Sequence, residues 1–151
     1  MNYLVIGAGG VGGPIGAYLT RAGFDTTLIA RGEHLAAMQR DGLTILTPFG
    51  RWNVPVKADD MAHYRATPDV VIVCVKGYSL DETAAFLQRV CAAHTVVIPL
   101  LNIYGTGRRL QERLPASLVT DGCIYISANR TAPGEIFMHG EIFRVVYGTP
   151  D

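Results

Sequence analysis

The sequence predicts an α/β fold with a doubly wound parallel sheet and an antiparallel β extension at its C-terminal end. Residues 3–6, 69–75 and 95–101 are apolar runs without polar alternation, and such runs are typical of strands that are buried on both faces. Helical patterns separate these runs, as the crossovers of a parallel sheet require. Beyond Ser117 the chain has only β patterns, so we expect the extension to follow the parallel part.

The first strand leads into a glycine-rich turn made of Gly7, Ala8, Gly9, Gly10, Val11 and Gly12. At this spacing Gly7 allows a tight turn, Gly9 lets the backbone approach a pyrophosphate, and Gly12 lets the next helix pack close to the strand. The N-terminus of that helix offers free amides and a positive dipole end to phosphates. Strand, glycine loop and helix together predict a Rossmann-type, dinucleotide-binding unit. The alternative is a glycine-rich turn that binds nothing.

Arg31 directly follows the second predicted strand, residues 26–30. Units that bind NAD carry an acidic residue at about this place, ~20 residues beyond the glycines, whereas a nearby arginine accommodates the 2′-phosphate of NADP. A guanidinium binds a phosphate through two parallel hydrogen bonds. The sequence therefore predicts NADP as the cofactor, with Arg31 on its 2′-phosphate. The alternative is a solvated arginine that contacts no ligand.

A helix and a hairpin are expected next. Residues 33–40 have helical spacing and stop at a glycine, which is a common C-terminal signal. Residues 43–47 and 52–56 then alternate in polarity on either side of a turn, which predicts an antiparallel hairpin. We place this hairpin at the edge of the parallel sheet, because an edge strand tolerates Pro55. Trp52 is expected to belong to the core.

Two helices and the extension complete the predicted order of elements. Ser79 is expected to cap a helix over residues 80–92, and Thr106 a short basic helix over residues 107–114, since hydroxyl side chains satisfy the free amides of a first turn. The extension is expected to be a meander with strands at residues 118–127, 134–139 and 143–147.

Polar side chains follow two of the buried strands. Lys76 comes directly after residues 69–75, and Asn102 directly after residues 95–101. Ligands of doubly wound sheets bind outside the carboxyl ends of the strands, so both side chains are expected at the cofactor crevice. Asn102 offers a donor and an acceptor to a hydroxyl or carbonyl group, whereas Lys76 has an equally good interpretation as an ordinary loop lysine. Pro99 is expected to fray the strand or to cause a bulge.

The composition narrows the classes of function. A chain of 151 residues fits one domain, with no internal boundary. Thirteen basic and thirteen acidic residues cancel, which predicts neither a nucleic-acid partner nor an anionic membrane surface. We find no secretory leader pattern and no apolar run near the ~20 residues of a membrane span. We therefore expect a cytoplasmic protein whose partner is a small molecule.

The cysteines and histidines predict no metal site. Cys74, Cys91 and Cys123 are odd in number and lie in apolar segments, which favours buried thiols in a reducing compartment over disulfides. The four histidines show no ligand spacing. A hydrophobic content of 49% and a mean hydropathy of +0.23 are high for a small domain, and they suggest a face that is buried elsewhere.

Several motifs together resemble the N-terminal nucleotide-binding domain of the ketopantoate reductase (2-dehydropantoate 2-reductase) family. Besides the glycine loop they are residues 30–35 (ARGEHL), Val75 with Lys76, Asn102 with Gly105, and residues 126–128, 133–136, 139–140 and 147–148. The resemblance extends from Tyr3 to Asp151. It implies reduction of 2-dehydropantoate to pantoate by NADPH, as in pantothenate biosynthesis. It also implies that Arg31 binds the 2′-phosphate and that Lys76 and Asn102 line the cofactor and substrate crevice.

The resemblance also implies what residues 1–151 lack. In the family the proton-donating lysine and the substrate-binding acid lie in a helical second domain of similar size, so no catalytic residue is assigned here and the isolated chain is expected to be inactive. The missing domain should leave an apolar patch near the carboxyl-end rim or the final strand, which a homodimer would cover. Ile103 and Tyr104 separate Asn102 from Gly105, where the family usually has glycine after the asparagine, and this leaves the accepted substrate open.

Two other functions remain open on the sequence. One is a non-catalytic regulatory nucleotide sensor built on the same fold, although such sensors usually carry an acid after the second strand, where this chain has Arg31. The other is a related reductase for a different small keto or hydroxy acid.

Overall fold

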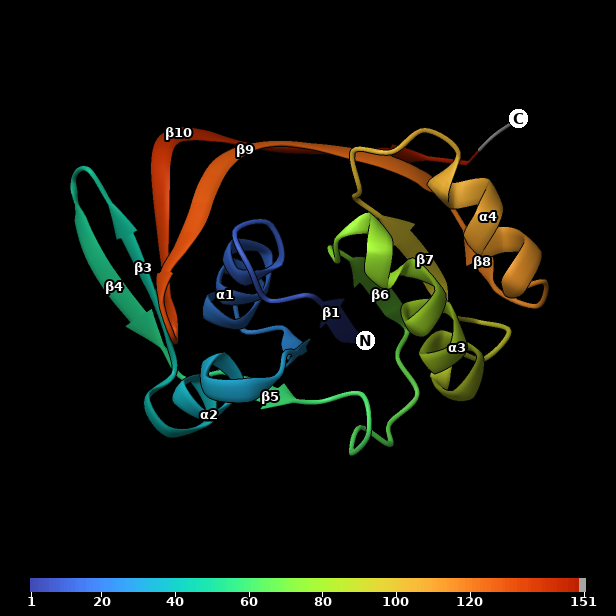
Figure 1. The fold of residues 1–151 in the computed structure, drawn as a ribbon, viewed down its shortest axis with the longest axis horizontal. Helices are drawn as coiled ribbons and strands as arrows, with labels where there is room; N and C mark the ends of the chain where they lie inside the picture. Colours follow the sequence, from blue (N-terminus) through green and yellow to red (C-terminus); the bar gives the residue numbers. More distant parts are fainter. Residues whose placement is uncertain (150–151) are drawn as a thin grey trace.

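A parallel sheet forms the centre of the molecule, which a computed structural model describes for residues 1–149 (Figure 1). Six strands lie in the order β5-β2-β1-β6-β7-β8, and every neighbouring pair is parallel. Their bounds are β1 Asn2–Ile6, β2 Asp25–Ile29, β5 Lys57–Asp59, β6 Val70–Val73, β7 Val96–Pro99 and β8 Leu118–Val119. The chain winds outward from β1 in both directions, which confirms the doubly wound fold.

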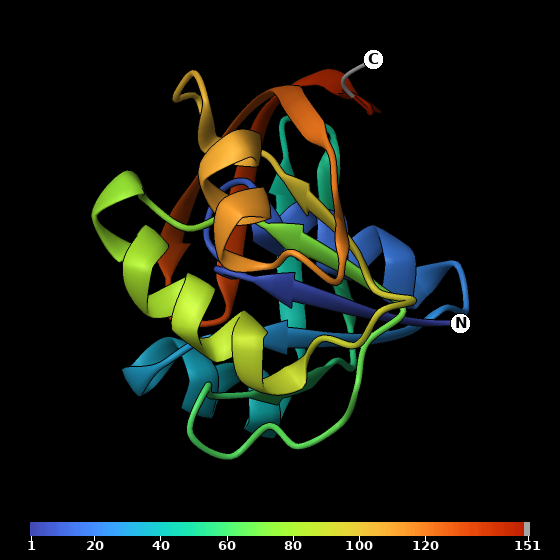
Figure 2. The ribbon, with the colours of Figure 1, turned by 90° about the vertical axis from the view of Figure 1, so that its right-hand side faces the viewer.

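Helices connect the parallel strands. They are α1 Gly12–Arg21, α2 Gly32–Asp41, the 3₁₀ turn η1 Gly77–Ser79, α3 Leu80–Val90 and α4 Thr106–Arg113. Successive residues of each strand point to opposite faces, so Leu4 and Val71 pack with α3 and α4, whereas Val5 and Leu28 pack with α1 and α2. Figure 2 shows α3 and α4 together on one side of the strands.

The predicted hairpin belongs to a second sheet. The strands β3 Leu43–Thr47 and β4 Gly50–Val54 form the expected antiparallel hairpin, but this hairpin does not lie at the edge of the parallel sheet. It belongs to a second sheet together with β9 (Asp121–Ala132) and β10 (Glu135–Gly148). The order of this sheet is β4-β3-β10-β9, and β3 pairs in parallel with β10. The edge position is taken by β5, which we did not predict. An alternating pattern defines which face of a strand is apolar, but it does not specify the partner strand.

The predicted meander is a long hairpin instead. Its strands are β9 Asp121–Ala132 and β10 Glu135–Gly148, which pair antiparallel. The two runs expected as separate last strands are both part of β10, with a register irregularity between Met138 and Phe143. Leu118 and Val119, expected at the start of the extension, form β8 in the parallel sheet. The antiparallel extension itself is confirmed.

Pro99 causes no bulge in β7, because the register with β6 stays regular up to Pro99, but the strand ends at this residue and does not continue to residue 101 as expected. Val96 and Leu100 donate their amides to carbonyls at Asp69 and Val73 on the side of β6, so the nitrogen of Pro99 faces the opposite side. There β8 has already ended at Val119, and no ladder hydrogen bond is lost.

Two helix caps also differ from expectation. Ser79 precedes α3 but makes no capping hydrogen bond with its side chain, because the 3₁₀ turn η1 leads directly into the helix. Gly105, with a φ of +82°, is the N-cap of α4. Thr106 is the first helical residue, and its hydroxyl donates to the carbonyl of Ile103 over 2.7 Å.

Not all of the side chains expected in the core are buried. Cys123 is exposed, and Cys74 and Cys91 are half-buried; all three are free thiols. Although the residue Cys74 as a whole is half-buried, its thiol is surrounded by protein, and this burial raises the pKa of the thiol to about 12. Trp52 is half-buried beneath the guanidinium of Arg21, which lies 4.6 Å from its ring centroid. No helix within residues 1–149 is long and apolar enough to cross a membrane.

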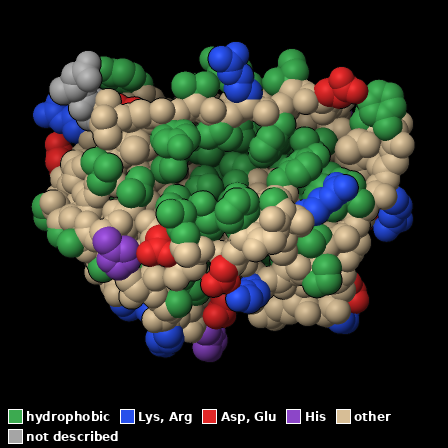
Figure 3. All heavy atoms as spheres, turned by 180° about the vertical axis from the view of Figure 1, so that it is seen from behind, with side chains coloured by type: hydrophobic (Ala, Val, Ile, Leu, Met, Phe, Trp, Pro, Cys, Tyr) green, Lys and Arg blue, Asp and Glu red, His purple; other side chains and the backbone are tan. Residues whose placement is uncertain are grey.

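One face of the parallel sheet is incompletely covered. Val70, Ile72 and Val96 lie on the central strands β6 and β7 and point away from α3, yet they are only half-buried. Parallel sheets are normally covered on both faces. Figure 3, drawn from behind Figure 1, shows apolar side chains gathered in a hollow on this side. We call these three residues the bare face.

We predict that Gly12→Ala destabilises the fold while Gly9→Ala does not. A Cβ at Gly12 would overlap the Gly7 carbonyl oxygen, whereas a Cβ at Gly9 would meet no atom within 4 Å. Overpacking costs ~1 to 3 kcal/mol, so urea unfolding should show a loss of that size for Gly12→Ala and at most ~0.5 kcal/mol for Gly9→Ala. Equal losses would contradict the packing described here.

Candidate functional site

A cleft of about 580 Å³ opens at the carboxyl edge of the parallel sheet. Because β1, β2 and β6 are parallel, their carboxyl ends meet at this edge, and the residues after them face one another. The lining includes Gly7, Ala8, Gly9, Arg31, His34, Asp60, Lys76, Tyr78, Glu82 and Arg130. The glycine loop, the end of β2 and the end of β6 are thus brought together as the sequence predicted.

The glycine loop has the geometry of a phosphate-binding turn. Gly7 has a φ of +90°, and a Cβ there would lie 2.9 Å from the Cys74 carbonyl oxygen. Gly9 faces open space, and its carbonyl accepts the amide of Gly13 over 2.8 Å. Within residues 1–149 no acceptor binds the amides of Gly9, Gly10 or Val11. These free donors at the N-terminus of α1 are suited to an anion.

Gly10 has a further role that the sequence pattern did not indicate. A Cβ on this residue would overlap the carbonyl oxygen of Ala128 on β9. The glycine loop is therefore packed between the parallel sheet and the second sheet. Since β9 follows the loop by more than a hundred residues, only the folded structure reveals this contact.

The predicted side chains occupy different parts of the edge. Arg31 is exposed at the N-cap of α2, and Lys76 is exposed at the start of η1; both line the cleft. Asn102 is exposed after β7 on the same edge, but it is not among the residues that line the cleft. The neighbouring side chain of Ile103 lies against Gly77, so the loop that carries Asn102 is next to Lys76. Tyr104 is fully exposed.

The structure adds a third cation to the two that the sequence indicated. Arg130 reaches the cleft from β9, and we did not identify it because its strand was expected only as part of an extension. Among residues 1–149, Arg31, Lys76 and Arg130 have no carboxylate within ion-pair distance. Unpaired charges of one sign in a cleft attract a ligand of the opposite sign.

His34 is a buried residue of the site. In the sequence analysis it belonged to the motif of residues 30–35, but no role was assigned to it. It is 5% exposed. Its Nε2 lies 2.6 Å from the carbonyl oxygen of Ala8, and its Nδ1 accepts the amide of Gly134 over 2.9 Å. Burial lowers the pKa of His34, and the positive charge of Arg130 lowers it further. His34 is therefore neutral at neutral pH.

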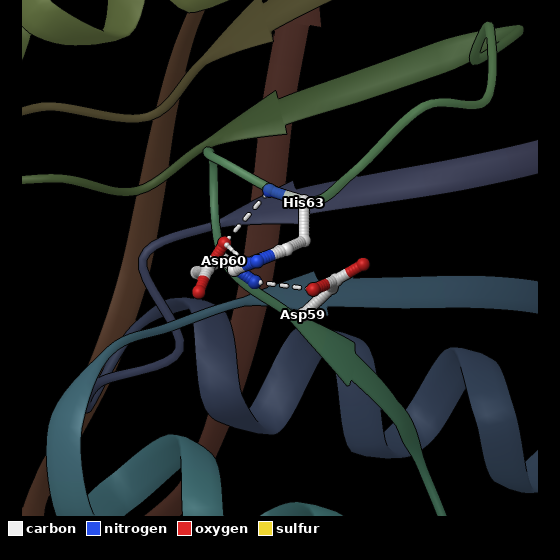
Figure 4. Close-up of side chains that lie close together, drawn as sticks. All are labelled: Asp59, Asp60 and His63. Carbon is white, nitrogen blue, oxygen red and sulfur yellow. Dashed lines mark hydrogen bonds and ion pairs between the residues drawn. The ribbon is translucent and has the colours of Figure 1, made fainter.

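Asp59, Asp60 and His63 form a cluster at the end of β5 (Figure 4). Their possible ligand atoms lie within 4.8 Å of one another, although the histidine spacing predicted no metal site. The Asp59 carboxylate accepts the Asp60 amide, and the Asp60 carboxylate accepts both the amide and Nδ1–H of His63, each over 2.8 Å. The His63 hydrogen bond lowers the pKa of Asp60. These short-range hydrogen bonds are those of a tight turn, and the turn explains why the three side chains lie close together.

A second hollow, of about 770 Å³, lies along α3 and the loop of residues 61–67. Two arginines, Arg65 and Arg89, line it. Arg65 donates to the carbonyls of Ala62 and Tyr64, and Arg89 donates to the carbonyl of Tyr64 over 3.0 Å and to that of Met61. Because backbone carbonyls already accept from both guanidinium groups, the hollow is less suited to an anionic ligand than the cleft at the strand ends.

The sheet order and the glycine loop define the class: this is a Rossmann-type dinucleotide-binding domain. The sequence profile described as Ketopantoate reductase PanE/ApbA matches residues 3–151. The chain therefore belongs to that family, whose 2-dehydropantoate 2-reductases are NAD(P)-dependent oxidoreductases, and the resemblance stated above is confirmed.

Individual relatives agree with this assignment. The chain is 34% identical to 2-dehydropantoate 2-reductase of Halobacterium salinarum, over 90% of this chain and 45% of that protein. It is 30% identical to the uncharacterized oxidoreductase YkpB of Bacillus subtilis, over 98% of this chain and 48% of that protein. The crystal structure of 2-dehydropantoate 2-reductase from Porphyromonas gingivalis matches with 33% identity and a TM-score of 0.85, over 97% of this chain and 53% of that one. The chain spans about half the length of these relatives.

Proposed function

We propose that this chain is the NADPH-binding half of a 2-keto-acid reductase that converts 2-dehydropantoate to pantoate. The observation that carries the proposal is the convergence of free glycine-loop amides and three unpaired cations on one cleft. NADPH carries a pyrophosphate and a 2′-phosphate, and this distribution of donors and positive charge matches both. Bound in the cleft, NADPH would supply a hydride to the keto carbon of the substrate.

Each group of the site has a separate task in this proposal. The amides of Gly9 and Gly10 bind the pyrophosphate, and Arg31 binds the 2′-phosphate. Lys76 and Asn102, on the neighbouring ends of β6 and β7, orient the nicotinamide end and the substrate. The developing alkoxide needs a proton donor. We assign this donor to the half of the protein that the relatives have in addition, because Lys76 already serves the cofactor.

We predict that Arg31→Ala weakens NADPH binding roughly 10- to 150-fold and leaves NADH binding nearly unchanged. A hydrogen bond to a charged group is worth ~1.5 to 3 kcal/mol, which converts to that range. Calorimetric titration with both cofactors measures it. The matched control is Arg40→Ala, because Arg40 lies on the same helix but pairs with Asp41 over 2.8 Å. Equal losses for both cofactors would reject the role of Arg31.

The isolated chain should bind NADPH and yet show no measurable ketopantoate reduction. Loss of general acid catalysis alone costs ~100- to 10,000-fold, and an open cleft also leaves its electrostatic contacts exposed to water. Spectrophotometry of NADPH oxidation with 2-dehydropantoate tests this. Robust turnover by the 151-residue chain would show that the proton donor lies within it.

The bare face is the surface on which we place the second half of the protein. Val70, Ile72 and Val96 are half-buried apolar side chains in the middle of a parallel sheet, and the relatives are about twice as long as this chain. A helix of that second half would complete the cover that α1 supplies over β1 and β2. From the sequence we expected the apolar patch near the carboxyl-end rim or the final strand, whereas the bare face lies on β6 and β7. A homodimer is the alternative cover of this face.

We predict that Val70→Asp weakens the binding of the C-terminal half of the protein to the bare face. Light scattering of the chain mixed with the C-terminal half of the Halobacterium salinarum relative should show a one-to-one complex for the wild type, with at least ~10-fold weaker binding for the variant. Phe49→Asp is the control, because Phe49 is 82% exposed at the tip of the other hairpin. Self-association of the chain through Val70, without binding to the second half, would instead identify a homodimer.

A further inference from the structure

We infer that His34 is a positioning residue for the cofactor. In its neutral form it holds the glycine loop in the conformation that presents the Gly9 amide to the pyrophosphate. This inference rests on the proposed function, because it concerns the same cleft. His34 is a buried histidine at the cleft. We give it a structural task there and no part in the chemical step.

Three segments far apart in the sequence meet at the His34 ring. The ring comes from the first turn of α2, Ala8 belongs to the glycine loop, and Gly134 forms the turn between β9 and β10. Gly134 has a φ of +74°, and its carbonyl accepts the amide of Thr44 on β3 over 2.9 Å. His34 thus links the loop to a turn that is itself held by the second sheet.

The two hydrogen bonds require one tautomer. The amide of Gly134 can only donate, so Nδ1 must carry a lone pair, and Nε2–H then donates to the carbonyl of Ala8. A proton added to Nδ1 would oppose the amide of Gly134 with a second N–H group. The neutral ring satisfies both contacts, and the imidazolium ring satisfies one.

The contact with Ala8 orients the next amide. In a planar trans peptide the C=O and N–H groups point in opposite directions. The carbonyl of Ala8 points to His34, so the N–H of Gly9 points away from it. That N–H has no acceptor among residues 1–149, and it is available to a ligand above the loop.

Burial and the charge of Arg130 favour the neutral ring of His34, whereas the hydrogen bond to the Ala8 carbonyl favours the protonated ring. Arg130 approaches from β9 and opposes a positive ring, and the glycine loop contributes no charge. The other charged side chains that line the cleft are Arg31 at the N-cap of α2, Asp60 after β5, Lys76 after β6 and Glu82 on α3. Glu33 and Glu135 are the sequence neighbours of His34 and Gly134.

The direction of the pH dependence follows from the lowered pKa. Below the ordinary value of 6.5 the unfolded chain binds a proton before the folded chain does, so stability falls as the pH falls. The neutral ring is kept down to the lowered pKa, and below it the hold on Gly134 is lost. Cofactor affinity should fall as the pH passes below this lowered pKa, because His34 then becomes protonated in the folded chain.

The test compares His34→Gln with His34→Ala. Glutamine can accept from Gly134 and donate to Ala8 without titrating, whereas alanine can do neither. NADH is the probe, because it lacks the 2′-phosphate, which itself titrates near pH ~6. Wild type should lose about 10-fold in NADH affinity between neutral pH and the pH at which His34 is protonated. His34→Gln should bind within about 3-fold of wild type without this pH dependence, and His34→Ala should bind about 10-fold more weakly throughout.

A control and a second readout separate the possible outcomes. His63→Gln removes the histidine paired with Asp60 and should keep the wild-type pH profile. The Gly9 amide signal in NMR spectra of the unliganded chain should titrate in wild type and not in His34→Gln, which tests the inference even if no cofactor binds. Failure of wild type to bind any cofactor would reject the proposed function alone. A Gly9 signal or an affinity that titrates equally in His34→Gln and wild type would overturn the inference.

Discussion

The close approach of α1 to the end of β1 is the constraint on which the rest of the structure depends. It is possible only because Gly7 turns the chain with a φ of +90° and Gly12 carries no Cβ against the Gly7 carbonyl. The same turn lies against the Cys74 carbonyl at the end of β6. One pair of glycines therefore brings a helix N-terminus and two strand ends to a common edge, and the cleft follows from that arrangement.

The second sheet completes the cleft from outside the parallel sheet. Its long hairpin packs against Gly10 through Ala128, supplies Arg130 to the lining, and holds His34 through Gly134. A site that looks like a short local motif is in fact supported by residues more than a hundred positions away. The second sheet packs against Ile98 on β7 but leaves the bare face, Val70, Ile72 and Val96, only half-buried.

The central strands β1, β2, β6 and β7 of the parallel sheet could be predicted from the sequence, whereas its edge strands β5 and β8 and the assembly of the second sheet could not. Continuous apolar runs such as residues 69–75 require burial on both faces, and this requirement is local. The alternation of residues 43–47 predicts a strand with one apolar face, but its parallel pairing with β10 is a long-range choice that no local pattern records. Arg130 was missed for the same reason. Arg31 and Lys76 were found because strand ends in this fold share an edge.

The proposed function requires a dinucleotide in the cleft with its pyrophosphate on the N-terminus of α1. A crystal structure of the chain with NADPH tests this most directly. We expect the pyrophosphate within hydrogen-bond distance of the Gly9 and Gly10 amides and the 2′-phosphate beside Arg31. NADPH bound instead in the hollow along α3, or lying across the cleft with no phosphate on the glycine loop, would contradict it.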